Sequence, residues 1–332
     1  MKKYHVYGMG AALVDTEIEV TDENLQAMQV DKGLMTLVDE QRQHELLEHL
    51  EGHLIHSKRA SGGSAANSII AVNSFGGNAF FSGKVANDDN GSFYMGDLSA
   101  AGVDTPANAG SENGITGKCL VMITPDAERS MNTFLGISES FSTDDLDYDA
   151  LAQSEYLYVE GYLVTSPTGR AASIAAREHA EKNGVMTSIS FSDPGIVEHF
   201  DDGIREMIGD GVDLVFCNED EALSFASTDN LDTAIEAIGR IAKCSVITLG
   251  AKGAVVCEGS DRWHVDGVKV NAVDTNGAGD MFAGAYLYGI THGLSAEQAG
   301  AFASNAAARI VSIFGPRLPV PDHAPLRSGY FD

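Results

Sequence analysis

The residues with the clearest chemical potential form the run DTNGAGD at positions 274–280. Gly277, Ala278 and Gly279 allow the backbone to approach a ligand closely, and the run MFAGAYLYGI that follows has the pattern of a helix. The first N–H groups of a helix lack intrahelical acceptors, and together with the helix dipole they bind anions. The run therefore indicates an anion-binding turn at the start of a helix over 278–291.

An aspartate inside such a turn is electrostatically unusual, because its negative charge repels a bound phosphate. Asp280 makes sense there if it takes a proton from a hydroxyl that then attacks the phosphate. The alternative is a glycine-rich helix start in which Asp280 is a simple first-turn acid. Spacing alone does not separate these two interpretations.

Two further positions carry polar groups suited to a ligand. Asp15 follows an apolar, strand-like segment, and ligands in open α/β sheets gather at the carboxyl ends of strands. Gly62 and Gly63 precede small residues and Asn67, a pattern suited to a close-approach turn into a helix. The Asn67 amide offers both a donor and an acceptor to a diol. Each signal is weak alone, since turn acids and Gly-Gly turns are common.

Asn218 and Glu221 are a candidate metal-binding pair. They lie three residues apart after a predicted strand and therefore share one face of a helix start. Their oxygen atoms suit Mg²⁺, which usually keeps several waters and takes few protein ligands. The same sequence, NEDE, is also good capping chemistry for a solvated acidic helix start, so both interpretations stay open.

The elements that must position these residues alternate along the chain. Six short apolar segments have the pattern of strands, at 4–9, 79–83, 156–161, 186–191, 213–217 and 245–249. Segments with helical periodicity separate or follow them, at 168–183, 231–243, 278–291 and 295–313. In the last of these, Ser295 is the expected N-cap, with Gln298 three residues on. This alternation predicts a largely parallel sheet with helices on both faces.

Two segments break the alternation, at 16–38 and 114–135. Both have alternating polarity, and the second contains the turn-forming pair Pro125-Asp126. We expect antiparallel strands added to the main sheet, acting as a lid over the site. The chain has no linker or internal repeat, which favours a single domain over residues 1–332 with this β-rich addition.

Composition excludes several classes of function. Of the 332 residues, 21 are Lys or Arg and 48 are Asp or Glu, which gives a net charge of −27. A nucleic acid or an anionic membrane surface is therefore not expected as a partner. The four cysteines are widely spaced, and the N-terminus resembles a strand rather than an export signal, so we expect a cytoplasmic protein with reduced thiols.

Five motifs together resemble a known family. DTNGAGD is similar to the signature D-T-x-G-A-G-D of the ribokinase-like (PfkB) carbohydrate and nucleoside kinases. The other four occur in the family's order, namely GMGAALVD at 8–15, GGSAAN at 62–67, CNEDEA at 217–222 and TLGAKGAVV at 248–256. The resemblance implies an α/β, ribokinase-like three-layer fold with a mostly parallel central sheet and a small β-rich lid.

The resemblance also implies a reaction, the transfer of the γ-phosphoryl group of ATP to a primary hydroxyl of a nucleoside or sugar. It assigns Asp280 as the general base and places phosphate on the backbone amides of 277–280. It implies Mg²⁺ near Asn218 and Glu221, bound directly or through water. The residues it implies for the acceptor are Asp15, Gly62, Gly63 and Asn67, and those for the nucleotide are Asn218, Glu221, Thr248, Gly250, Gly253 and Asn305.

The acceptor is less well defined. Ile69 stands where many sugar kinases have a small residue, and in this the run GGSAANSI resembles the adenosine kinase branch. Arg129 on the predicted lid is placed to meet phosphate or substrate. Adenosine is the expected acceptor, with a sugar of the ribose or fructose type as the alternative. A non-catalytic sensor of nucleosides or sugars is the second alternative, and the intact GAG with Asp280 argues against it. Dependence on a monovalent cation such as K⁺, for which Asp274 is the candidate ligand, and the choice between monomer and homodimer stay open.

Overall fold

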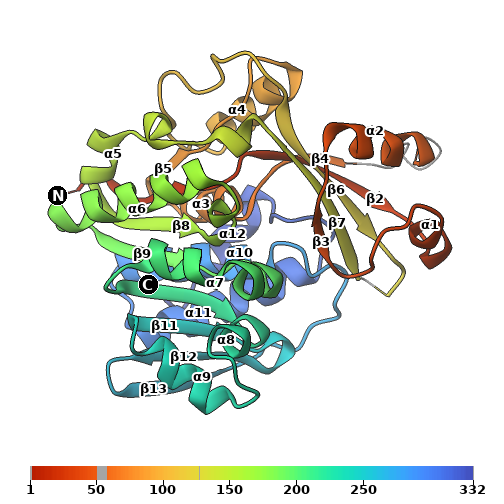
Figure 1. Cartoon of the computed structure of the whole chain (residues 1–332). Helices are drawn as coiled ribbons and strands as arrows, with labels where there is room; N and C mark the ends of the chain where they lie inside the picture. The colour runs from red at the N-terminus through yellow and green to blue at the C-terminus, as the bar shows by residue number, and fades with distance from the viewer. Residues whose placement is uncertain (1, 51–57, 127, 332) are drawn as a thin grey trace.

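The computed structural model describes residues 2–50, 58–126 and 128–331. At its centre is an eight-stranded sheet in the order β13-β12-β11-β10-β9-β8-β1-β5 (Figure 1). All neighbouring strands from β11 to β5 are parallel, and β12 and β13 are antiparallel additions at one edge. The strands are β1 Tyr4–Met9, β5 Ala79–Ser82, β8 Ser154–Glu160, β9 Met186–Ser190, β10 Val212–Asn218, β11 Ala242–Thr248, β12 Gly253–Glu258 and β13 Asp261–Asp266.

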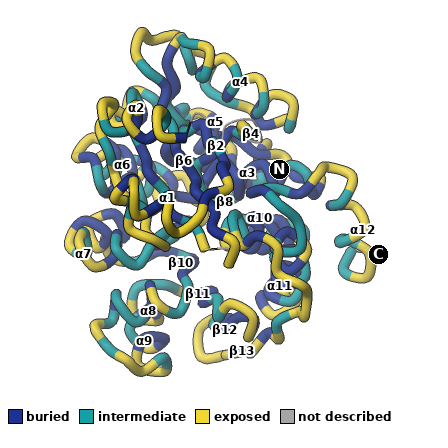
Figure 2. The backbone as a smooth tube through the Cα atoms, turned by 90° about the vertical axis from the view of Figure 1, so that its right-hand side faces the viewer, coloured by how far each residue is buried: buried dark blue, intermediate teal, exposed yellow. Residues whose placement is uncertain are grey.

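Helices cover both faces of this sheet, which confirms the three-layer arrangement predicted from the sequence. The inner strands are apolar on both sides, as parallel strands covered on both faces require. In Figure 2 they appear mostly as buried tube, whereas exposed residues gather on the outer helices. One core includes α3 Ser64–Ser74, α4 Asp89–Ala100, α10 Ala278–Thr291 and α11 Ala296–Val311. The other includes α5 Tyr148–Ala152, α6 Pro167–Lys182, α7 Pro194–Ile208, α8 Glu219–Phe225 and α9 Leu231–Ile238.

Most of the elements predicted for the main sheet and its helices are present, and one of these helices has the wrong end. The six predicted strands correspond to β1, β5, β8, β9, β10 and β11, and the Ser295 capping box with Gln298 is confirmed. The predicted helix over 231–243 is wrong at its end, because α9 stops at Ile238 and Gly239 follows it. Ala242 already pairs with Val212 in the sheet, so tertiary pairing with β10 overrides the local helical pattern.

The lid is a second sheet and does not extend the first, which corrects the sequence prediction. Its order is β3-β7-β6-β2-β4, from β2 Leu13–Glu19, β3 Met35–Leu37, β4 Lys58–Gly62, β6 Thr116–Ile123 and β7 Arg129–Gly136. It is also mixed, since β2 runs parallel to β6 and β3 runs parallel to β7. The segment 16–38 further contains a short helix, α1 Asp22–Ala27. Strand β4, which pairs with β2, was not predicted.

The face of the lid that points away from the main sheet carries its own cover. Buried Ile18, Leu120 and Met122 of the lid strands, with Val20 just after β2, pack with residues of α1 and of α2 Glu40–His49. Both helices lie on the outer side of the lid (Figure 1). Two helices of the same chain thus cover the outer apolar face, and the inner face is left for the cleft between the two sheets.

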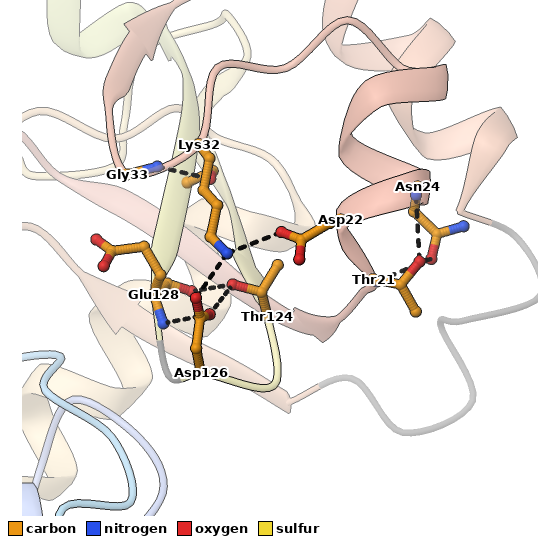
Figure 3. Close-up of polar contacts among 9 residues, drawn as sticks. Thr21, Asp22, Asn24, Lys32, Gly33, Thr124, Asp126 and Glu128 are labelled. Atoms are coloured by element: carbon orange, nitrogen blue, oxygen red, sulfur yellow. Dashed lines mark hydrogen bonds and ion pairs between the residues drawn. The ribbon is translucent and has the colours of Figure 1, made fainter.

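Polar contacts tie the tip of the lid together (Figure 3). The Nζ of Lys32 donates to Asp22 Oδ1 at 2.8 Å and to Asp126 Oδ2 at 2.7 Å. Asp126 also accepts from the Thr124 hydroxyl at 2.6 Å, within the β6–β7 hairpin. Solvent screens exposed ion pairs of this kind, so the buried contacts of the outer face contribute more to the stability of the lid.

The strand order fixes where a ligand can bind. From β1 the chain crosses to β5 on one side, whereas β8 and the strands after it lie on the other side. Such a reversal leaves a crevice at the carboxyl ends of the strands, here between Met9 and Glu160. Within the described residues, no helix has the length and apolar character that a membrane crossing requires.

Candidate active site

A pocket of about 400 Å³ opens at this crevice, between the inner face of the lid and the carboxyl ends of the main strands. The lid contributes alternate residues of its strands, as expected where one face of a sheet borders a cavity. They are Leu13, Asp15, Met35, Leu37, Cys119, Val121, Arg129, Met131, Thr133 and Leu135. The opposite wall comes from α3, from the ends of β8, β10 and β11, and from the start of α10.

The pocket brings together most of the residues singled out from the sequence. Those that line it are Asp15, Gly63, Asn67, Arg129, Asn218, Glu221, Thr248, Gly277, Ala278, Gly279 and Asp280. Four others lie outside its lining, namely Gly62, Gly250, Gly253 and Asn305. Residues more than 200 positions apart in the sequence therefore share one cavity, where a single ligand can meet them together.

Asp280 lies in the first turn of α10 and is held by two donors from α3. The Ser64 hydroxyl donates to Oδ1 at 2.6 Å, and the Asn67 amide donates to Oδ2 at 2.9 Å. Burial raises the pKa of Asp280 above its ordinary value, and the two hydrogen bonds act in the opposite direction. The carboxylate is thus more basic than an exposed aspartate and has a fixed orientation at the wall of the pocket.

The turn before α10 has the backbone shape that anion binding needs. Gly277 is in the left-handed region with φ 69°, and a Cβ there would lie 2.2 Å from the Pro316 carbonyl oxygen, so only glycine fits. A Cβ on Gly279 would meet no protein atom within 4 Å, because this position borders the cavity. Among the described residues, no acceptor bonds to the N–H groups of Gly279 and Asp280. Both donors are available to an anion.

Asp15 is buried at 8% exposure, but it does not end the first strand as the sequence suggested. Strand β1 ends at Met9, and the chain then enters the lid, where Asp15 pairs with Ala60 and Cys119 inside β2. Its carboxyl group lies against Gly62, where a Cβ would come within 2.1 Å of the carboxylate oxygens. Gly62 therefore makes room for Asp15 instead of lining the pocket.

The electrostatics of Asp15 are set by its burial. Desolvation raises the pKa of this carboxyl group to about 7, and the neighbouring charge of Glu17 adds to the shift. The positive charges of Arg317 and Arg129 act in the opposite direction. A buried carboxyl group of this kind is stabilised by hydrogen bonds from hydroxyl groups that a ligand brings into the pocket.

Sequence reasoning missed Glu160, which ends β8 and is 1% exposed. Its Oε1 accepts from Ala11 N at 3.2 Å and its Oε2 accepts from Ala65 N at 2.8 Å. Glu160 thereby connects the segment after β1 with the first turn of α3. Burial raises the pKa of Glu160 to about 7. A charged residue closing an apolar strand was the signal that could have identified it.

Arg129 begins β7 and reaches across to the loop before α10. Its guanidinium forms an ion pair with Asp274, a residue that is fully buried. Asp274 also accepts backbone N–H bonds from Asn276 and Gly315, each at 2.9 Å, so protein donors already surround the candidate K⁺ ligand. Within the described part of the chain, Nε and Nη1 of Arg129 are buried and have no partner. These two donors suit an anionic ligand.

Asn218 and Glu221 form a capping box at the start of α8. The backbone N–H of Asn218 donates to Glu221 Oε2 at 3.0 Å, and its side-chain amide donates to Glu221 Oε1 at 2.7 Å. The backbone N–H of Glu221 donates to Asn218 Oδ1 at 2.8 Å. Burial raises the pKa of Glu221 to about 8, with a further contribution from the charge of Asp193. The capping interpretation is thus correct locally, and both side chains also line the pocket with hard oxygen ligands.

The remaining residues predicted for nucleotide binding are divided. Thr248 ends β11 and lines the pocket, whereas Gly250 and Gly253 shape the turn between β11 and β12. Asn305 lies on α11 and donates to the Tyr330 hydroxyl at 2.6 Å and to the Ala301 carbonyl at 3.0 Å. Its amide therefore fastens the C-terminal segment to α11.

Comparison with known families gives a match along most of the chain. The model of the pfkB family of carbohydrate kinases matches residues 27–323. Among curated proteins, the adenosine kinase of Saccharomyces cerevisiae is 29% identical over 338 residues, covering 94% of this chain and 96% of that protein.

Solved structures agree with the fold. A probable sugar kinase from Rhizobium etli superimposes with a TM-score of 0.92 at 34% identity, covering 98% of each chain. The adenosine kinase from Sinorhizobium meliloti superimposes with a TM-score of 0.91 at 35% identity, covering 97% of this chain and 98% of that one. The two sheets thus occur in a fold that this chain shares with a probable sugar kinase and an adenosine kinase.

Proposed function

Because this chain belongs to the pfkB family of carbohydrate kinases, we propose that it transfers the γ-phosphoryl group of ATP to a primary hydroxyl of a ribonucleoside, with adenosine the best candidate. The observation that carries the proposal is the position of Asp280. Its carboxylate, fixed by Ser64 and Asn67, stands beside the free N–H groups at the start of α10. A base and an anion site are therefore adjacent, as attack by a hydroxyl on a phosphate requires.

In the proposed reaction, Asp280 accepts the proton of the acceptor hydroxyl as that oxygen attacks. Asp15 and Asn67 hold the other hydroxyl groups of the acceptor, and Asn67 Oδ1 is buried without a partner among the described residues. The N–H groups of Gly279 and Asp280, with the free guanidinium nitrogens of Arg129, stabilise negative charge on the transferring group. The lid excludes water, which would otherwise compete as the nucleophile.

The wall opposite the acceptor fits ATP and Mg²⁺. Gly279 leaves open space beside two free N–H donors, which suits phosphate oxygens. Asn218 and Glu221 would hold the metal through oxygen atoms or water, and no cluster of three or more metal-binding acids, histidines or cysteines occurs among the described residues. Mg²⁺ usually keeps several waters and binds few protein groups, so two side chains can hold it. When bound, the metal would neutralise phosphate charge.

The inner face of the lid supports a nucleoside over a free sugar. Leu13, Met35, Leu37, Val121, Met131 and Leu135 all line this side of the pocket. A nucleobase is flat and largely apolar on its faces, so it would cover these side chains, whereas a free sugar would leave them in contact with water. The names of the yeast and Sinorhizobium relatives agree with this choice.

A sugar acceptor is the second candidate, because the similar Rhizobium etli protein is described as a probable sugar kinase. Measuring transfer of labelled γ-phosphate from ATP to adenosine, other ribonucleosides, ribose and fructose separates the two. We expect the highest kcat/KM with adenosine. Preference for ribose or fructose would move the substrate assignment to sugars, and no transfer to any acceptor would favour a binding protein instead.

We further propose that the chain acts as a monomer. The outer face of the lid is covered by α1 and α2 of the same chain, so within the described residues it offers no bare sheet face to a second copy. Light scattering coupled to size-exclusion chromatography would show a mass near 35.1 kDa. A mass twice as large would contradict this proposal.

A further inference from the structure

The side chain of Ser64 has an unusual position for the first residue of a helix. A serine at a helix start commonly bonds to the backbone of its own first turn. Here α3 is preceded by Gly63, which provides no side-chain cap, and the Ser64 hydroxyl points to Asp280 Oδ1 at 2.6 Å instead. The bond joins residues 216 positions apart and connects the starts of α3 and α10.

The surroundings of Asp280 make this bond important. The titratable groups that face it are two carboxyl groups, Asp15 on β2 and Glu160 on β8, and two phenols, Tyr158 on β8 and Tyr162 after it. The positive charges of Arg129 and Arg317 act on Asp15. Among the described residues, the side chains that bond directly to the Asp280 carboxylate are Ser64 and Asn67, one on each oxygen.

We propose that Ser64 is a positioning residue, whose hydroxyl holds Asp280 ionised and oriented toward the acceptor hydroxyl. The inference rests on the proposed function, in which Asp280 is the base. Asn67 alone would leave Oδ1 without a donor, and the carboxylate could then rotate about its Cβ–Cγ bond. Because a hydrogen bond to a charged group is stronger than a neutral one, its loss also favours the protonated carboxyl group, which cannot act as a base.

The test is the pH dependence of kcat/KM for the acceptor, whose acidic limb reports ionisation of the base in the free enzyme. In Ser64→Ala we expect that limb to move to higher pH and kcat to fall by about 10-fold at pH 7, with a larger loss at lower pH. Ser64→Thr keeps a hydroxyl and should return the limb toward that of the wild type. Ser64→Cys, a weaker donor, should give an intermediate position and serves if Ser64→Ala does not fold.

Ser68→Ala is the matched control. Ser68 lies one turn further along α3, and its hydroxyl bonds to the Ser64 carbonyl at 3.1 Å and to the Tyr158 hydroxyl at 3.4 Å without reaching Asp280. We expect its acidic limb to match that of the wild type. An unmoved limb in Ser64→Ala, an equal shift in Ser68→Ala, or a shift that Ser64→Thr does not reverse would each overturn the role of Ser64. Full activity in Asp280→Asn would instead overturn the proposed function, so the two failures are distinguishable.

Discussion

The guanidinium of Arg129, on a lid strand, forms an ion pair with the buried carboxylate of Asp274, the residue that opens the DTNGAGD run. The pair joins the lid directly to the loop that precedes the candidate anion site. Since Nε and Nη1 of the same guanidinium have no partner within the described residues, Arg129 can serve the lid contact and a ligand together.

The first prediction concerns this ion pair. Removing one member leaves a buried charge uncompensated, so Arg129→Met should lower the free energy of unfolding by about 3 kcal/mol. Adding Asp274→Asn to that variant should restore about 1 kcal/mol or more, as measured by denaturant unfolding. The exposed pair of Arg309 with Asp322, at 3.1 Å, is the control, and Arg309→Met should cost about 1 kcal/mol or less. Equal losses in the two variants would show that the Arg129 pair contributes no more than a surface pair.

The second prediction concerns the base. Asp280→Asn removes the proton acceptor and keeps the shape of the side chain, so kcat should fall by at least about 100-fold with the fold intact. Acceptor affinity should change little, because the loss lies in the transition state. Steady-state kinetics and circular dichroism check both parts, and near-normal turnover would remove Asp280 from the mechanism.

The third prediction concerns magnesium. Glu221→Gln removes a carboxyl group that can ionise when the hydrated metal binds, so the enzyme should require more Mg²⁺ and recover part of its activity at high Mg²⁺. Glu219→Gln is the matched control, because Glu219 begins the same helix and pairs instead with Lys252 at 3.7 Å. An Mg²⁺ titration of both variants checks this. If Glu221→Gln titrates like the wild type, the capping box is the whole role of Glu221.

The fourth prediction concerns recognition of the acceptor. A site built to bind hydroxyl groups rejects analogues that lack them, because its own buried polar groups are left unpaired. The 2′-deoxy analogue of the nucleoside should therefore react with a kcat/KM lower by about 100-fold or more. Asp15→Ala should reduce the ratio of the two kcat/KM values, because the side chain that binds the hydroxyl group is then absent. An unchanged ratio in an active Asp15→Ala enzyme would exclude Asp15 from acceptor recognition.

The fifth prediction concerns pH and stability. Burial raises the pKa of Glu160 from 4.5 to about 7, so between these values the folded state binds more protons than the unfolded state. This group therefore stabilises the fold below about pH 4.5, and that contribution is lost as the pH rises to about 7. The free energy of unfolding of Glu160→Gln, relative to that of the wild type, should therefore rise by at least about 1 kcal/mol from pH 5 to pH 8.

Denaturant unfolding of both proteins across this range measures the change. Glu258→Gln, at an exposed position, is the control for replacing a glutamate with glutamine. A difference between Glu160→Gln and the wild type that does not change with pH would mean that Glu160 is ionised in the fold throughout.

The sequence by itself determined the layered fold and indicated several of the residues that line the pocket. Periodicity located the six parallel strands because both faces of such strands are buried and their apolar runs are continuous. The spacing of DTNGAGD placed Asp280 in the first turn of a helix, because a left-handed glycine and a helix start are local features. Even the capping box of Asn218 and Glu221 is a contact between near neighbours in the chain.

Tertiary structure alone decided how distant segments meet. The sequence did not indicate that the lid forms a separate mixed sheet, because strand pairing depends on long-range register, and a strand pattern does not name its partner. Ser64 and Glu160 gain their roles only when α3, β8 and α10 converge, since neither is close in sequence to the groups it holds. Likewise Asp274 has no marked partner in the sequence, and burial beside Arg129 follows from how the lid docks on the main sheet.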